Sequence, residues 1–401
     1  MAKPNTNDEI PEINVGVVGH IDHGKTTLLS KLTGKFTDTH SEELKRGITI
    51  KLGYAETIIC KDKDGFNNKG KGIPQRYVSF IDAPGHEMLM ATMLSGAAII
   101  DAAILVIAAN EGIKPQTREH FVALQAKKIK DIIIIQNKID LVDKEQAVKN
   151  YKEIKEFVKG TIAENSPIIP VSAQQELNID KIFEALCSIK IPDHDSSKPP
   201  CFLIARSFDI NKPGTEIKNL SGGILGGILK HGTLNVGDEI EIKPGRVVKK
   251  ANQKNYETLN SKILSLHKGN KSVDEVHPGA SISIETSLDP ILTKADSLVG
   301  CLVSRKGTLP EISYKVKIKP TLFKEVLGIE AHKPVDPIKT KEMLMLSVNT
   351  TITVGSVEKI SKNDIELLLN IPIVAIKEDN LGIARNIDGH WRLIGFGEIV
   401  I

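Results

Sequence analysis

The segment from Gly19 to Thr26 has the residue types and the spacing that bind a phosphate chain. It reads Gly-His-Ile-Asp-His-Gly-Lys-Thr and matches the pattern G-x-x-x-x-G-K-[ST]. Glycines let the backbone wrap closely enough for its N–H groups to face phosphate oxygens. We expect Lys25 to meet the β and γ phosphates and the Thr26 hydroxyl to bind Mg²⁺. The alternative is a chance glycine turn, but the apolar run before this segment and the helical spacing after it both favour the phosphate loop.

A second polar turn, Asp82-Ala-Pro-Gly85, follows another apolar run. A carboxylate at this position could hold Mg²⁺ through water, and the Gly85 N–H could contact a γ-phosphate. Alone, D-x-x-G is better explained as an ordinary turn. Paired with the phosphate loop, it indicates a nucleoside triphosphate site.

The segment Asn137-Lys138-Ile139-Asp140 has side chains that could distinguish guanine from adenine. Asp140 could accept hydrogen bonds from the N1–H and the exocyclic amine of guanine, a pair that adenine does not offer. Lys138 could lie along the ring plane. The alternative is that Asp140 only caps a helix. Ser172-Ala173, after the next apolar run, is too short to indicate a site by itself. It supports one only because it follows the other three motifs along the chain.

Buried strands must position these segments. Continuous Ile and Val runs suit parallel strands that helices cover on both faces, and polar loops at their carboxyl ends form the ligand site. We therefore expect residues 1–198 to form a doubly wound, mostly parallel α/β domain. The expected strands are 13–18, 78–81, 104–108, 132–135 and 168–171, and the expected helices include 26–32 and 179–189.

The pattern changes after the polar, proline-terminated stretch 193–200. Short alternating apolar segments follow, separated by Gly, Asn, Asp and Pro, and long helical periodicity is absent. A further break falls near 305–311. We expect two all-β barrel domains, at residues 199–309 and 310–401.

Composition narrows the class of protein. The 401 residues include 53 Lys and Arg against 50 Asp and Glu, a balance too mild to identify a nucleic-acid binder. No apolar run reaches the ~18 residues of a membrane span, and the N-terminus lacks the apolar region of a secretory signal. The four cysteines form no C-x-x-C pair. We expect a protein of the reducing cytoplasm, without membrane association.

In this order and at these strand ends, the motifs resemble the GTPase family. His20, Asp22 and His23 in the phosphate loop, and His86 after the second turn, make the chain similar to translational GTPases of the elongation factor Tu type. The segment 46–50 resembles that family's switch I. Stretches at 39–54, 206–214, 222–227 and 390–395 resemble, more narrowly, the gamma-subunit family of archaeal and eukaryotic translation initiation factor 2.

The resemblance implies an α/β P-loop GTPase domain followed by two all-β barrels, and it assigns roles to residues. His86 would position the attacking water, and Ile21 would help keep His86 out of place until a partner signals. The nucleotide would be bound by Asp22, His23, Gly24, Lys25, Thr26, Thr27, Asp82, Gly85, Asn137, Lys138, Asp140, Ser172, Ala173 and Gln174, and Mg²⁺ by Asp22, Thr26, Gly47 and Thr49.

The function implied by the resemblance is GTP-dependent delivery of initiator methionyl-tRNA to the small ribosomal subunit, together with alpha and beta subunits. Hydrolysis of GTP to GDP, slow without stimulation, would switch the affinity for tRNA. An elongation-type carrier of aminoacyl-tRNA, including the selenocysteine-specific kind, is one alternative. A non-hydrolysing scaffold with a structural nucleotide is another.

One departure from the family pattern concerns zinc. Many relatives carry a knuckle of four cysteines after switch I, whereas segment 60–76 here retains only Cys60. Tetrahedral zinc needs four ligands, so we expect none to bind. The polar loop would be mobile or would hold its shape in another way.

Two features of the first expected barrel have open interpretations. Between Lys243 and Lys271 lie eight basic residues and one acid, Glu257, a run that could contact RNA phosphates or form a solvated barrel face. The glycine-rich stretch 222–227 could admit a tRNA end, but a tight strand crossing is the preferred interpretation.

Overall fold

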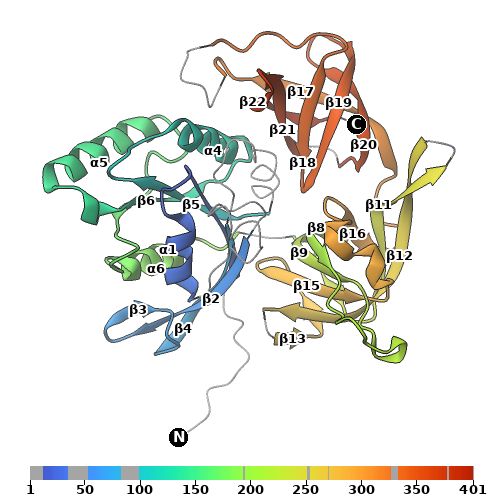
Figure 1. Cartoon of the computed structure of the whole chain (residues 1–401), viewed down its shortest axis with the longest axis horizontal. Helices are drawn as coiled ribbons and strands as arrows, with labels where there is room; N and C mark the ends of the chain where they lie inside the picture. The colour runs from blue at the N-terminus through green and yellow to red at the C-terminus, as the bar shows by residue number, and fades with distance from the viewer. Residues whose placement is uncertain are drawn as a thin grey trace, which may run out of the picture. The chain divides into compact units, whose positions relative to one another are not determined.

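The computed structural model describes residues 12–34, 53–82, 99–192, 195–250, 253–269, 271–326, 333–376 and 379–400. The chain divides into two compact units, of which the first is mostly blue to green and the second mostly yellow-green to red in Figure 1. The first unit comprises 1–86, 100–121 and 129–193, and the second comprises 87–99, 122–128 and 194–401. None of the helices in the described ranges has both the length and the apolar character required to span a membrane.

The first unit is built on a mixed sheet, which has the strand order β3-β2-β4-β1-β5-β6-β7 in the described part of the chain. Strands β4, β1, β5, β6 and β7 pair in parallel, and β2 and β3 extend one edge in antiparallel pairing. The strands are β1 (Glu12–Gly19), β2 (Gly53–Asp62), β3 (Gly65–Asn67), β4 (Ile73–Asp82), β5 (Ala102–Ala108), β6 (Asp131–Asn137) and β7 (Ile168–Pro170).

Helices cover both faces of this sheet, which confirms the doubly wound α/β expectation. Every residue of β5 is buried, as a strand covered on both sides requires. Figure 1 shows α1 (Lys25–Thr33) and α6 (Ile179–Ser188) on one side, and α4 (Pro115–Ala126) and α5 (Lys144–Val158) on the other. Leu28 of α1 and Phe183 of α6 belong to one core cluster with Val15 of β1.

The first barrel has the strand order β11-β16-β8-β9-β15-β12-β13 among its described residues, and pairing of β11 with β12 closes it. Its strands alternate between core and solvent: Ile282 and Ile284 of β15 are buried, and Ser283 between them is not. The strands are β8 (Cys201–Phe208), β9 (Ile224–His231), β10 (Leu234–Asn235), β11 (Glu239–Lys250), β12 (Gln253–Lys268), β13 (Lys271–Val273), β14 (Glu275–Val276), β15 (Ser281–Thr286) and β16 (Leu302–Arg305).

Close strand contacts explain the glycines around β9. A Cβ atom on Gly222 would lie 1.7 Å from the carbonyl oxygen of Thr286, and one on Gly227 would lie 1.9 Å from that of Leu203. Neither position has room for a side chain. The preferred interpretation of a tight strand crossing therefore agrees with the structure.

The second barrel is closed, with the described strand order β17-β20-β19-β18-β21-β22. The expectation of two all-β barrels is thus confirmed, and the division of the chain after residues 198 and 309 stays a prediction. The strands are β17 (Ile312–Leu322), β18 (Met343–Val348), β19 (Thr351–Ile360), β20 (Ile365–Val374), β21 (Asn380–Ile387) and β22 (His390–Ile399).

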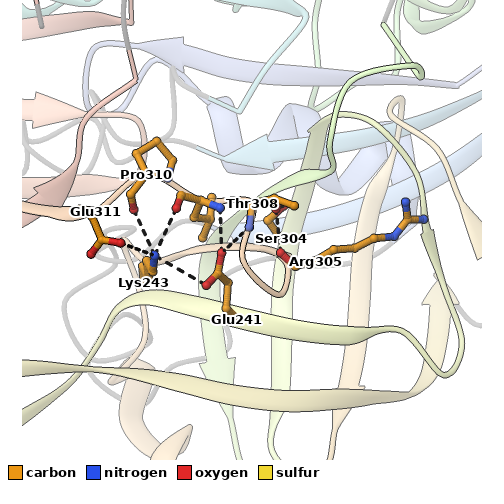
Figure 2. A network of polar contacts seen from close by, with 8 residues as sticks. Glu241, Lys243, Ser304, Arg305, Thr308, Pro310 and Glu311 are labelled. Carbon is orange, nitrogen blue, oxygen red and sulfur yellow. Dashed lines mark hydrogen bonds and ion pairs between the residues drawn. The ribbon is translucent and has the colours of Figure 1, made fainter.

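A buried ion pair anchors the segment that leads from the first barrel into the second (Figure 2). Oε1 of Glu241 accepts the backbone N–H groups of Thr308 at 2.9 Å and Leu309 at 2.7 Å. Nζ of Lys243 donates to the carbonyl oxygens of Leu309 at 3.1 Å and Pro310 at 3.3 Å. The two side chains, both buried, approach to 3.6 Å. Each charge is compensated by its partner and by backbone groups, which makes its burial tolerable.

The basic run 243–271 is therefore not one exposed surface. For Lys243, which is buried, both interpretations are wrong: it neither contacts RNA phosphates nor lies on a solvated barrel face. Arg246, which pairs with Glu257 at 2.8 Å, lies opposite it in the β11–β12 register. The side chains of Lys249 and Lys250 lie outside the described residues, so whether they contact RNA stays open.

Replacing Lys243 with Met should lower the free energy of unfolding by about 3 kcal/mol, because Glu241 would remain buried without its counter-charge. Denaturant unfolding followed by circular dichroism measures the change. Arg246→Gln is the matched control, since its pair with Glu257 is exposed and should contribute less than about 1 kcal/mol. Equal losses from both variants would contradict a special role for the buried pair.

Candidate nucleotide-binding site

The phosphate loop, residues 19–26, joins the end of β1 to the start of α1 and has no room for side chains at two of its glycines. Gly19 has a φ of +141°, and a Cβ atom there would lie 2.4 Å from the carbonyl oxygen of Val106. Gly24 has a φ of +87°, and its Cβ would lie 2.5 Å from Nδ2 of Asn137. Glycine is required at both positions by conformation and by space.

Thr26 and Asp82 meet at the carboxyl ends of β1 and β4. The Thr26 hydroxyl donates to Oδ2 of Asp82 at 3.0 Å, and Asp82 is fully buried. The two strands are parallel neighbours, with Val17 opposite Asp82, so both loops emerge at the same edge of the sheet. A hydroxyl and a carboxylate are hard oxygen donors that fit Mg²⁺, which usually takes few protein ligands and completes its shell with phosphates and water.

Lys25 lies across the phosphate loop. Only 6% of its surface is exposed, and its Nζ donates to the carbonyl oxygen of His20 at 2.7 Å. This contact closes the loop on itself and holds the ammonium group at the N-terminus of α1. A phosphate bound there would face both the lysine charge and the helix dipole.

Asn137 ties the expected phosphate and base segments together. Its Nδ2 donates to the carbonyl oxygen of His23 at 2.9 Å, and its Oδ1 accepts the N–H of Ala173 at 3.1 Å. One amide side chain therefore joins the phosphate loop, the end of β6 and the loop after β7. The structure thereby brings the 137–140 segment and Ser172-Ala173 to one place, as the order of motifs predicts.

Asp140 remains available to a ligand. It is exposed, in a 3-10 turn at Ile139–Leu141, and the N-cap of the following helix α5 is a different residue, Asp143. Oδ1 of Asp143 accepts the N–H of Gln146 at 2.8 Å. The helix-capping alternative for Asp140 is therefore wrong. Gln174, another expected site residue, is also exposed and follows the buried Ala173.

Four of the expected site residues lie outside the described residues: Gly47 and Thr49 of switch I, and Gly85 and His86 after β4. Their assigned roles stay predictions. Among those that are described, Asp22 is exposed and has a left-handed backbone, with a φ of 60°.

Helix α4 supports the phosphate loop from behind, a contribution that sequence reasoning missed. Nδ1 of the buried His120 accepts the Gly19 N–H at 3.0 Å, and Oε1 of Gln116 accepts the Ile21 N–H at 3.4 Å. The four-residue spacing of Gln116 and His120 places them on one helix face. That spacing was the available signal, but nothing in the sequence showed which loop this face meets.

Two buried histidines near the loop are neutral. Burial lowers the pKa of His23 to about 3 and that of His120 to about 3. Nδ1 of His23 donates to the carbonyl oxygen of Val106, with 3.2 Å between the nitrogen and the oxygen. The phosphate loop thus receives its positive charge from Lys25 and not from these imidazoles.

The segment expected to lack zinc is ordered by hydrogen bonds in β2, β3 and β4. Asp62 accepts the N–H of Asp64 at 2.8 Å and the side-chain amide of Asn67 at 3.2 Å. Asn68 donates to the carbonyl oxygen of Leu32 at 3.0 Å, near the C-terminus of α1. Burial raises the pKa of Cys60, which favours a protonated thiol over a metal-binding thiolate. These residues do not fit a tetrahedral zinc site, and no group of three His, Cys, Asp or Glu able to hold a metal occurs in the described residues.

Comparison with known families assigns both ends of the chain. The family model for the elongation factor Tu GTP binding domain matches residues 11–191. The model for the C-terminal part of initiation factor eIF2 gamma matches residues 314–399. The first match covers the phosphate loop and the base segment, and the second covers the last barrel.

Relatives over nearly the whole length share about half of the residues. Translation initiation factor 2 subunit gamma from Thermococcus onnurineus is 49% identical over 398 residues, with 97% of each chain covered. The protein of the same name from Methanocaldococcus jannaschii is 50% identical over 400 residues, again with 97% of each chain covered.

Solved structures with the same fold include selenocysteine-specific elongation factors. A bacterial one has a TM-score of 0.75 at 25% identity, covering 97% of this chain and 58% of its own, so this chain spans little more than half its length. Elongation factor SelB from Methanococcus maripaludis, with a GTP analogue, has a TM-score of 0.73 at 22% identity, covering 98% and 80%.

The lowered pKa of His120 makes a contribution to stability that depends on pH. The unfolded chain takes up a proton on this residue below about 6.5, whereas the folded chain does so only near 3, so stability falls with pH between these values. His120→Asn, which can keep an acceptor near the Nδ1 position, should flatten the dependence of the unfolding free energy on pH by about 1.4 kcal/mol per pH unit around pH 5.

Denaturant titrations at a series of pH values measure this slope. His390→Asn, at an exposed position at the start of β22, is the control for replacing a histidine that is not buried. A His120→Asn slope equal to that of the unmodified chain would refute the neutral, buried state of this imidazole.

Proposed function

Because this chain belongs to the gamma-subunit family of translation initiation factor 2, we propose that it carries initiator methionyl-tRNA to the small ribosomal subunit. It is a translational GTPase. The observation that carries the proposal is identity of about half the residues, over 97% of the chain, with relatives named translation initiation factor 2 subunit gamma. The eIF2 gamma match of the last barrel supports it at the end of the chain farthest from the GTPase motifs.

The nucleotide would act as a switch of tRNA affinity. Lys25 and the N-terminus of α1 would bind the phosphates, and Asn137, Lys138 and Asp140 would bind guanine. Mg²⁺, when bound, would neutralise phosphate charge. Thr26 and Thr49 are assigned to hold it, with Asp22 and Gly47 close to it, and Asp82 could contribute through water. Contacts made only with the γ-phosphate would favour one conformation, and their loss on hydrolysis would favour another.

We assign His86 to the positioning of the attacking water, on the resemblance alone. Hydrolysis would be slow until a partner completes this arrangement. A His86→Ala variant that hydrolyses GTP at an unchanged single-turnover rate would contradict the assignment.

The partners of the proposed function are alpha and beta subunits of the same factor, in the cytoplasm.

Zinc is not part of the proposed function, because segment 60–76 offers one cysteine and is held by side-chain amides. A stoichiometric zinc content in the purified chain would contradict this.

The elongation-type alternative rests on the likeness to a selenocysteine-specific elongation factor and to elongation factor SelB. At 22% identity the likeness to SelB supports a shared fold, and it does not extend to the cargo. The initiation assignment is favoured because the relatives at 49–50% identity carry that name over almost all of their length.

Initiator methionyl-tRNA should bind at least about ten-fold more tightly to the chain, with its companion subunits, when a GTP analogue replaces GDP. The reason is that only the triphosphate makes the γ-phosphate contacts that favour the binding conformation. Filter-binding titrations measure both affinities. Elongator aminoacyl-tRNAs are the control: equal affinity for them would favour the alternative carrier, and equal affinity in GDP and GTP analogue would end the switch proposal.

Asp140→Asn should weaken GDP binding at least about 100-fold and improve binding of xanthosine diphosphate. An asparagine amide places a donor opposite the donors of guanine, whereas xanthine offers a carbonyl oxygen at that position. Competition for a fluorescent nucleotide measures the preference. Asp143→Asn, at the helix cap, keeps an accepting side-chain oxygen and should retain the preference for guanine.

A further inference from the structure

Glu111 lies between the phosphate segment and the base segment of the candidate site. It belongs to the turn after β5, where its own N–H donates to the carbonyl oxygen of Ala108 at 3.2 Å. Its Oε1 is 3.5 Å from Nζ of Lys138, and its Oε2 is 3.9 Å from Nε2 of His23. None of the assignments above gives Glu111 a role, although its carboxylate faces one residue from each segment.

The contact with Lys138 is the attractive one. Both side chains are a little over one quarter exposed, so solvent screens the ion pair only in part. The backbone of Lys138 is left-handed, with a φ of 60° and a ψ of 34°, a conformation that few non-glycine residues adopt. The backbone sets the direction in which the Lys138 side chain leaves the main chain, and Glu111 holds the ammonium group at its other end. A long, flexible lysine side chain is thereby restricted before the base arrives.

The contact with His23 is not an ion pair. Burial keeps this imidazole neutral, and its Nδ1 hydrogen is directed to the carbonyl oxygen of Val106. Its Nε2 is then an acceptor that faces a second acceptor, the Glu111 carboxylate. This approach gives no hydrogen bond, so attraction to His23 does not explain the position of Glu111. The position of Glu111 is explained by the hydrogen-bonded turn at Ala108 and by attraction to the ammonium group of Lys138.

The turn itself is tied to the base segment. The N–H of Ala109 donates to the carbonyl oxygen of Asn137 at 2.8 Å, and the N–H of Gly112 donates to that of Ala108 at 2.8 Å. Glu111 therefore projects from a turn that is hydrogen-bonded to the residue preceding Lys138. Backbone and side chain join the same two segments.

We propose that Glu111 is a positioning residue for guanine nucleotides, which holds the Lys138 ammonium group in place for the base. The proposal rests on the proposed nucleotide site and adds a residue to it. Glu111 would touch neither phosphate nor base, and it would act through Lys138. Its effect should therefore depend on Lys138 being present and should weaken as salt screens the pair.

The test is a double-mutant cycle of Glu111→Gln and Lys138→Met in the full chain, with GDP affinity measured by stopped-flow fluorescence of a labelled analogue. Glu111→Gln keeps the size of the side chain and removes its charge. It should weaken GDP binding about three-fold at low salt, and less at high salt. In the Lys138→Met background the same change should have no effect. Glu156→Gln, at an exposed ion pair with Lys159, is the matched control and should not alter affinity.

The cycle separates the failure of this inference from the failure of the nucleotide site. Unchanged affinity in Glu111→Gln, or an equal loss with and without Lys138, would overturn the positioning role. Tighter GDP binding when Glu111→Gln is added to Lys138→Met would also overturn it. The glutamine amide would then be acting by donating to Nε2 of His23. If Lys138→Met itself left GDP affinity unchanged, the base site as proposed would be wrong. Far-ultraviolet circular dichroism checks folding, and Glu111→Ala is the second variant if Gln proves unstable.

Discussion

The close approach of Asn137 to the phosphate loop is the constraint on which the rest of the first unit depends. Its amide lies where a side chain at position 24 would be, and it hydrogen-bonds both His23 and Ala173. Asn137 therefore fixes the phosphate loop against the end of β6 and the loop after β7. The parallel order β4-β1-β5-β6-β7 makes the approach possible, since it brings three separate strand ends to one edge.

Charged and neutral groups have different roles around the phosphate loop. The charge assigned to a bound phosphate is that of Lys25 at the N-terminus of α1. The support consists of neutral groups: His120 and Gln116 accept backbone N–H groups, and His23 is held without charge by burial. A protonated imidazole behind the loop would compete with Lys138 for the Glu111 carboxylate. Neutral acceptors satisfy the buried backbone without that competition.

Sequence patterns predicted the elements and the motif residues because these depend on local information. The buried strand β1, the glycine loop after it and Asn137 at the end of β6 lie where the sequence predicted them. The antiparallel strands β2 and β3, the support from His120 and the burial of Lys243 were not predicted. Each depends on a partner far along the chain: His120 meets Gly19, and Lys243 meets Leu309. A helix face or a charge run has the same pattern whichever partner it meets.

The lysines show how far a residue type can determine a role. Lys25, Lys138 and Lys243 have the same side chain, yet one is assigned to phosphate, one is assigned to a base and one anchors a segment between barrels. Their roles differ with the acceptors that hold them: a loop carbonyl, a partly exposed carboxylate, and two carbonyls with a buried carboxylate. The more completely protein groups satisfy an ammonium, the less it has left for a ligand. By that measure Lys243 has a structural role, whereas the partly screened contact with Glu111 restrains Lys138 and leaves it able to bind.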